Sequence, residues 1–217
     1  MITKLRAHPV WAMLAYLALY LLGFGLLERW NRPFHPVYCR LDGLIPFVPA
    51  AVVPYLLWFG WIPLTLLWFL RRAPDAFWRL FGAIACGCTA ALGIFAVYPT
   101  VQLLRPPLPS NGPFTALVQL IYQVDTPTNV CPSLHTFVSV ILLLAVLTAG
   151  VPMHRSLKLA HALLCVSVCC STVLLRQHSC VDVFWGVVLA AVIWPLTGRW
   201  LQDVYGPRPQ RRPLLRS

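Results

Sequence analysis

The stretch STVLLRQHSCVD, from Ser171 to Asp182, lies between two long apolar runs, 158–175 and 181–198. Ionisable side chains are costly inside a membrane, and membrane proteins seldom keep them there without a use. His178 and Asp182 are four residues apart, which puts both side chains on one face of a helix. A carboxylate one turn from an imidazole can orient the ring and hold its tautomer, as a nucleophilic or acid–base histidine requires.

The composition around this stretch is strongly apolar. Of 217 residues, 59% are hydrophobic and 11% are charged, and the mean hydropathy is +0.73. A soluble domain is about half apolar, so the chain is predicted to be an integral membrane protein. Its net charge of +11 comes from basic residues in short loops and in the tail, which indicates membrane topology and not a nucleic-acid partner.

Apolar runs of about 20 residues can cross the ~30 Å hydrocarbon core of a bilayer. The predicted fold class is all-α: a polytopic membrane protein with a six-transmembrane-helix bundle. We expect one membrane-embedded domain over 1–217, with its core at about 40–200 and a basic cytoplasmic tail at 201–217. Prolines in the second run predict an irregular segment before its helix. The six runs are 9–27, 44–70, 80–98, 133–151, 158–175 and 181–198, and a short surface helix is expected at 114–124.

Basic residues orient the bundle by the positive-inside rule. With six spans, the most basic segments fall on one side, which is expected to be cytoplasmic. The loops 28–43, 99–132 and 176–180 then face outward from a plasma (inner) membrane. The first span is expected to be a retained anchor, because no small-residue cleavage site follows it. The cytoplasmic basic residues are Lys4, Arg6, Arg71, Arg72, Arg79, Arg155 and Lys158, followed by the tail.

Three polar clusters are expected to meet at the outward face, and their residue types fit phosphoryl transfer. Guanidinium groups hold phosphate oxygens in a fork, and the start of a helix adds free N–H groups. A neutral histidine can attack phosphorus while a second, protonated histidine protonates the departing oxygen. The clusters are Arg105 after the third span, Ser133 and His135 at the start of the fourth, and Arg176, His178 and Asp182 between the fifth and sixth.

Neither a metal nor a cofactor is expected. The chain has only six Asp and Glu residues, so arginines would replace the usual magnesium clamp on phosphate. Cys86 and Cys88 have the wrong spacing for a zinc site. Cys131 and Cys180 flank the candidate site, and a disulfide between them is one alternative. Asp42 either caps the second span or closes the site.

Three short motifs follow one another along the chain. They are Arg-Pro at 105–106, Pro-Ser-Leu-His at 132–135 and Ser-Thr-x5-His-x3-Asp at 171–182. Their order resembles the type-2 phosphatidic acid phosphatase superfamily, which carries Lys-x6-Arg-Pro, Pro-Ser-Gly-His and Ser-Arg-x5-His-x3-Asp on a six-span bundle. The resemblance covers roughly residues 40–200 and implies an enzyme acting on a lipid phosphate.

Three positions depart from the family pattern. Leu134 replaces the glycine, Thr172 replaces the arginine, and Tyr98 stands where the first motif has lysine. With Tyr98-Pro-Thr and a basic residue two before the histidine, the chain is similar to one branch, the inositol phosphorylceramide synthase-like and sphingomyelin synthase-like enzymes. Arg176, one turn after Thr172, would supply one of the missing cations.

The resemblance implies a role for each site residue. His178 would be the nucleophile that forms a phosphohistidine, Asp182 would orient it, and His135 would protonate the leaving alcohol. The phosphoryl oxygens would be held by Arg105, Arg176, Ser133 and Ser171.

Three functions remain open from the residues alone. The first is a lipid phosphatase, in which water accepts the phosphoryl group of a phospholipid or prenyl diphosphate; the small size and short loops favour it. The second is a lipid phosphotransferase that moves a phospho-headgroup to a hydroxyl acceptor, which the branch resemblance favours. The third is a non-catalytic phospholipid-binding or transport protein. No oligomeric state is predicted. An intramembrane serine protease is disfavoured, because neither Ser133 nor Ser171 is flanked by glycines.

Overall fold

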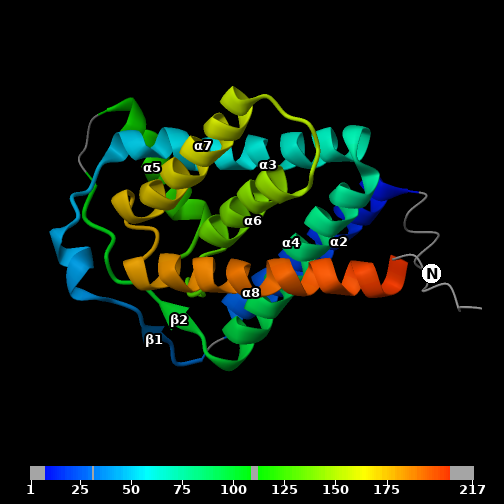
Figure 1. Cartoon of the computed structure of the whole chain (residues 1–217). Helices are drawn as coiled ribbons and strands as arrows, with labels where there is room; N and C mark the ends of the chain where they lie inside the picture. Colours follow the sequence, from blue (N-terminus) through cyan, green and yellow to red (C-terminus); the bar gives the residue numbers. More distant parts are fainter. Residues whose placement is uncertain (1–7, 31, 109–111, 206–217) are drawn as a thin grey trace, which may run out of the picture.

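The structure is a computed structural model that describes residues 8–30, 32–108 and 112–205, with the backbone alone at 199–205. Lys4, Arg6 and the tail beyond residue 205 lie outside the described residues. Figure 1 shows a bundle of helices with one small pair of strands at its lower left. In chain order the elements are α2 (Pro9–Arg29), β1 (His35–Pro36), η1 (Arg40–Leu44), η2 (Pro49–Ala51), α3 (Val52–Arg72), α4 (Pro74–Val97), β2 (Thr100–Val101), α5 (Pro113–Val124), α6 (Leu134–Thr148), α7 (Arg155–Leu174) and α8 (Cys180–Tyr205).

Five helices of the described chain are long and apolar enough to cross a membrane: α2, α3 together with η2, α4, α7 and α8. The chain is therefore an all-α membrane protein, but the predicted count of six spanning helices is not confirmed. The span predicted at 133–151 is α6, which has 15 residues. At 1.5 Å per residue this helix is roughly 22 Å long, which is less than the ~30 Å of hydrocarbon.

The position of α6 explains its length. It packs against α3, α4, α7 and α8, and its side chains Phe137, Ile141, Leu142 and Ala145 are fully buried. A helix enclosed by other helices meets protein along its sides, so its length does not have to match the bilayer. By contrast, α2 buries only Ala12 and presents most of its apolar side chains outward, as a lipid-facing helix does.

The loops before α3, after α4 and before α8 gather at the left of Figure 1. There β1 and β2 pair in parallel, with His35 opposite Thr100, and the N–H of Val48 donates to the Leu174 carbonyl at 3.0 Å. The predicted irregular segment is present as η1 and η2, and the short helix predicted at 114–124 is α5. The three loops predicted to face outward therefore share one end of the molecule.

Helix α8 approaches the start of α6 closely at Gly186. A Cβ on this residue would lie 2.6 Å from the backbone oxygen of Ser133 and 2.9 Å from the Cβ of Thr136. The nearest atom belongs to the backbone, so it cannot rotate away. Only glycine lets α8 pack this close to the helix that carries His135.

We expect Gly186→Ala to lower the unfolding midpoint in detergent, at a cost of about 1–3 kcal/mol, because the new methyl group must push α6 and α8 apart. Gly93→Ala on α4 is the matched control, since nothing lies within 4 Å of a Cβ there, and alanine favours a helix by about 0.5–1 kcal/mol. A thermal-shift assay compares the two variants. An unchanged midpoint for Gly186→Ala would contradict the close approach.

Candidate active site

The turn after α7 positions His178. The N–H of Gln177 donates to the Thr172 carbonyl at 2.9 Å, and the N–H of Arg176 donates to the Val173 carbonyl at 3.0 Å. This pair of bonds is a Schellman motif, in which the residue after the helix cap takes a left-handed backbone; here it is Arg176, with φ of 55°. The N–H of His178 also donates to the Thr172 carbonyl, at 3.1 Å, so the turn sets where the histidine begins.

His178 and Asp182 lie together as predicted, but not on one helix face, because His178 lies in the turn before α8 and only Asp182 is in that helix. Nδ1 of His178 is 3.3 Å from Oδ2 of Asp182; the histidine is 8% exposed and the aspartate is fully buried. The N–H of Ser179 donates to the same Oδ2 at 2.9 Å, which fixes the carboxylate in the first turn of α8. With Nδ1 turned toward the carboxylate, Nε2 is the nitrogen available for chemistry.

His135 is the second histidine of the site. Its ring centroid lies 5.7 Å from that of His178, edge to face. On the α3 side, the rings of Tyr55 and Trp58 lie 4.5 Å and 4.3 Å from it. Nε2 of His135 is buried and has no hydrogen-bond partner among the described residues. Buried polar atoms without a partner are rare in proteins, and this one belongs to the ring that faces His178.

Ser133 is the N-cap of α6. Its hydroxyl is fully buried and accepts a long bond, 3.4 Å, from the N–H of Thr136, as serine does at helix starts. The N–H of Ser133 donates to the backbone oxygen of Asp182 at 3.0 Å. This bond ties the start of α6 to the start of α8, so the structure brings the second and third predicted clusters together.

Arg105 reaches the same region from the loop after α4. Its guanidinium donates to the Gln177 side chain at 2.5 Å and to the Asp125 carbonyl at 2.6 Å, and it lies over the Tyr122 ring at 4.3 Å. Burial lowers the pKa of Arg105, and the Asp125 carboxylate opposes that shift; arginine nevertheless stays charged in proteins. A positive charge therefore lies against the residue that precedes His178.

The other two predicted phosphate ligands make bonds within the protein. The Arg176 guanidinium donates to the backbone oxygens of Asp42 and Ile45, and the Ser171 hydroxyl donates to the Val168 carbonyl at 2.7 Å. The two bonds of Arg176 offset the cost of a left-handed backbone at a non-glycine residue. Contact of Arg176 and Ser171 with phosphate stays a prediction.

Two departures from the family pattern have structural roles. Tyr98 is half exposed and stacks on His35 with the ring centroids 4.0 Å apart. Thr172 is fully buried, its hydroxyl donates to the Cys169 carbonyl at 2.8 Å, and its own carbonyl holds the turn before His178. Neither side chain supplies a positive charge where the family motif has one.

Asp42 caps α8, and not the second span as one alternative had it. The carboxylate is fully buried and accepts bonds from the N–H of Cys39 at 2.8 Å, the hydroxyl of Ser179 at 2.6 Å and the N–H of Cys180 at 2.8 Å. Burial alone would raise the pKa of Asp42, but the three donors outweigh burial, and the pKa lies below its ordinary value. Asp42 therefore binds the first loop to the segment that carries His178.

We expect Asp42→Asn to destabilise the protein at neutral pH by about 1.5–3 kcal/mol, because three donors lose a charged acceptor. The folded-state pKa is lowered, so this contribution is complete above the unfolded value of about 4 and is lost as pH falls through the lower folded value. The gap in unfolding midpoint between wild type and Asp42→Asn should shrink below about pH 4. A gap that stays constant as the pH is lowered would contradict this role.

Tyr55, Trp58 and Gln177 contact the site residues, and sequence reasoning did not single them out. The Tyr55 hydroxyl donates to the Asp125 carboxylate at 3.0 Å, and the Gln177 amide contacts the same carboxylate at 3.4 Å. Phe, Tyr or Trp residues occur in five of the six predicted spans, so no pattern marks these two rings. Gln177 could have been noticed as a polar residue beside His178 in a buried turn.

The cysteines near the site are free thiols. Burial and the neighbouring Asp182 carboxylate raise the pKa of the Cys131 thiol to about 12. Cys131 and Cys180 are not joined by a disulfide, and the thiol of Cys39 lies within 4.8 Å of that of Cys180.

Comparison with protein-family models matches residues 77–205 to the PAP2 superfamily. No curated protein and no solved structure matches the chain. The matched region covers more than half of the chain and contains all the predicted site residues, from Arg105 to Asp182. The resemblance to an inositol phosphorylceramide synthase-like branch is not confirmed by this match. The chain belongs to the PAP2 superfamily, whose members are phosphoryl-transfer enzymes.

Proposed function

We propose that this chain is a membrane phosphatase that hydrolyses a phosphate monoester or diphosphate of a lipid through a phosphohistidine on His178. One observation carries the proposal: the His178–Asp182 pair lies beside His135 within the region that matches the PAP2 superfamily. Family membership supports a lipid enzyme of the phosphatase or phosphotransferase type.

In the first half-reaction, Nε2 of His178 attacks phosphorus while Asp182 holds the ring through Nδ1. A P–N bond forms, and the P–O bond to the lipid breaks. The departing oxygen takes a proton from His135, whose ring faces that of His178. General acid catalysis of this kind is worth about 10²–10⁴-fold in rate.

In the second half-reaction, water replaces the lipid. His135, now neutral, takes a proton from the water as its oxygen attacks phosphorus. The P–N bond breaks, inorganic phosphate leaves, and His178 returns to its starting state. His135 thus acts first as acid and then as base, His178 acts first as nucleophile and then as leaving group, and the protein is unchanged after each cycle.

The phosphoryl oxygens need cationic partners. Arg105, held against Gln177, is the first of these in our proposal. Arg176 has N–H groups beyond the two that bind carbonyls, and the hydroxyls of Ser133 and Ser171 complete the set. We propose a metal-independent reaction, because the chain has six acidic residues and Asp42 and Asp182 are already engaged.

The proposal includes a topology. In this topology α6, which is enclosed by the other helices, is the remaining span of a single domain over 1–217. The distribution of basic residues supports a site on the extracytoplasmic face of the plasma (inner) membrane. An impermeant thiol reagent should label Leu103→Cys, at an exposed position in the loop after β2, in intact cells in a background without accessible cysteines. Protection of that cysteine until the cells are opened would contradict this orientation.

A phosphotransferase is the second candidate. It shares the first half-reaction, but a lipid or polyol hydroxyl replaces water as the acceptor. The segments Tyr98-Pro-Thr and Pro132-Ser-Leu-His favour it, because they resemble the inositol phosphorylceramide synthase-like branch. A non-catalytic phospholipid-binding protein is the third candidate, and it should keep its ligand affinity in His178→Ala.

Phosphate release separates these candidates. The purified protein in detergent, with a chelator present, should release phosphate from phosphatidic acid or from a prenyl diphosphate. If no phosphate is released but a labelled headgroup moves onto a hydroxyl acceptor, the protein is a phosphotransferase and not a phosphatase. If either lipid binds but neither phosphate release nor headgroup exchange occurs, the protein is the non-catalytic lipid-binding protein of the third candidate.

A further inference from the structure

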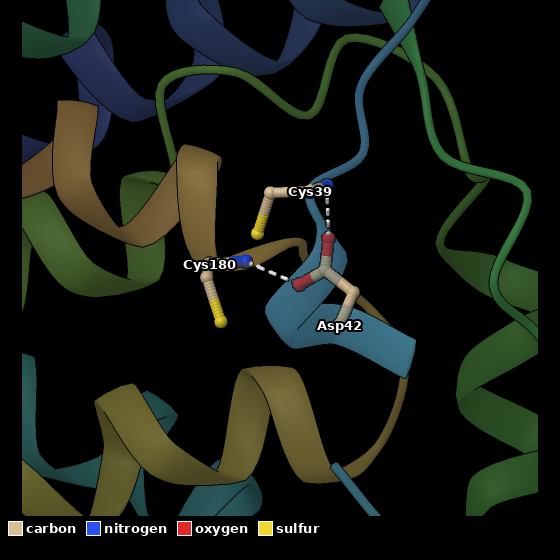
Figure 2. Close-up of side chains that lie close together, drawn as sticks. All are labelled: Cys39, Asp42 and Cys180. Carbon is tan, nitrogen blue, oxygen red and sulfur yellow. Dashed lines mark hydrogen bonds between the residues drawn. The ribbon is translucent and has the colours of Figure 1, made fainter. Parts of the chain in front are cut away.

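Two cysteines from distant parts of the chain lie side by side near the candidate active site. Cys39 precedes η1, and Cys180 is the first residue of α8. Their sulfur atoms and a carboxylate oxygen of Asp42 all lie within 4.8 Å of one another. Figure 2 shows the thiols of Cys39 and Cys180 on the same side of Asp42. The backbone nitrogens of both cysteines bond to the Asp42 carboxylate. The group joins the first loop to the helix that follows His178.

Asp42 holds the two cysteines at this distance. One carboxylate oxygen accepts the N–H of Cys39 at 2.8 Å, and the other accepts the N–H of Cys180 at 2.8 Å. Because a single buried carboxylate binds both backbones, the two residues cannot drift apart without breaking a charge-assisted bond. The fold therefore holds the backbones of Cys39 and Cys180 near one another.

The group is better suited to sulfur chemistry than to a metal. Structural zinc sites take four ligands, and this group offers three among the described residues. Both oxygens of Asp42 already accept hydrogen bonds, three in all. A disulfide needs only the two thiols and leaves those bonds in place.

We propose that Cys39 and Cys180 form a disulfide that fixes the first loop to the start of α8. The oxidant is a small-molecule or protein disulfide. One cysteine thiolate attacks it to give a mixed disulfide and one released thiol, and the second cysteine thiolate then displaces the other. Two S–H bonds break, one S–S bond forms in the protein, and two electrons reduce the oxidant to two thiols.

The inference rests on the proposed topology, since disulfides persist in oxidising compartments and are rare in the cytosol. The bond would close a loop from residue 39 to residue 180, within which most of the site residues lie. It would hold the first turn of α8, and with it Asp182, against the first loop. The site would then keep its geometry when lipid enters.

The test uses the full-length protein in detergent, incubated with oxidised glutathione, blocked with an alkylating reagent and digested without reductant. Mass spectrometry should find a cross-linked peptide that contains Cys39 and Cys180, lighter by two hydrogen atoms than the sum of the reduced peptides. Alkylation of both residues, or a cross-link from either one to Cys131, would overturn the proposal. Because this readout needs no turnover, a protein without phosphatase activity still tests the bond.

Variants and cells complete the test. Cys39→Ser should leave Cys180 open to alkylation, whereas Cys170→Ser, on the exposed face of α7, should leave the cross-link intact. Reduction should lower the unfolding midpoint of the wild type by about 5 °C or more and leave that of Cys39→Ser unchanged. Alkylation in intact cells should find both thiols blocked by the bond. If the two thiols are free in cells and bonded only in the purified protein, the disulfide is not native and the extracytoplasmic placement is overturned. This result does not test the proposed phosphatase activity.

Discussion

His178→Ala should reduce lipid phosphate turnover by about 10⁴-fold or more, because removal of a covalent nucleophile leaves only binding and charge stabilisation. The imidazole is the group that Asp182 orients through Nδ1, and in the proposed mechanism it alone forms the P–N bond. Phosphate release and a substrate-binding assay on the same preparation measure the effect. Binding should persist, since the expected loss is confined to the chemical step.

His8→Asn is the matched control for that variant. His8 is exposed and precedes α2, away from the site, so turnover should stay at the wild-type level. Equal unfolding midpoints would show that His178→Ala is folded. A His178→Ala protein that keeps more than about a tenth of the wild-type rate would contradict a nucleophilic role.

His135→Ala should lower turnover of a lipid phosphate by about 10²–10⁴-fold, because the departing alkoxide then has no proton donor. The loss should depend on the leaving group. An aryl phosphate, whose phenolate leaves without a proton, should form the phosphoenzyme at close to the wild-type rate. Single-turnover kinetics with the two substrates separate this step from hydrolysis.

The packing of His135 requires a second variant, because the ring packs against Tyr55 and Trp58. His135→Gln keeps a polar side chain of similar length and guards against collapse of the aromatic contacts. Equal losses for the lipid phosphate and the aryl phosphate in both variants would contradict the role of His135 as the acid.

The catalytic pair could be predicted from sequence because its geometry is local. The two residues are only four apart in sequence, and their 3.3 Å contact joins the turn before α8, where His178 lies, to the first turn of that helix. The long apolar runs were equally accessible, since five of the six have the length and hydropathy of a spanning helix in the structure. The run 133–151 forms the shorter helix α6, because this helix is enclosed by other helices. Hydropathy alone does not reveal that enclosure.

Other features depend on tertiary contacts. The prediction that Arg176 replaces the missing cation at Thr172 requires the helix to continue past Thr172, but α7 ends at Leu174. Arg176 has a left-handed backbone, and its side chain bonds to the first loop. Asp42 meets Ser179 across 137 residues of sequence, a contact that no periodicity signals. Long-range pairing of this kind becomes visible only when the fold is known.

The proposed mechanism requires a covalent bond between phosphorus and Nε2 of His178. Rapid mixing of labelled substrate with the purified protein, followed by an alkaline quench that preserves phosphohistidine, traps the intermediate for peptide mapping. The aryl phosphate with His135→Ala is the best combination, because the intermediate should form quickly and hydrolyse slowly. We predict label on the peptide that contains His178. Turnover of the wild type with no trapped label, or with label on another residue such as Ser133, would contradict this mechanism.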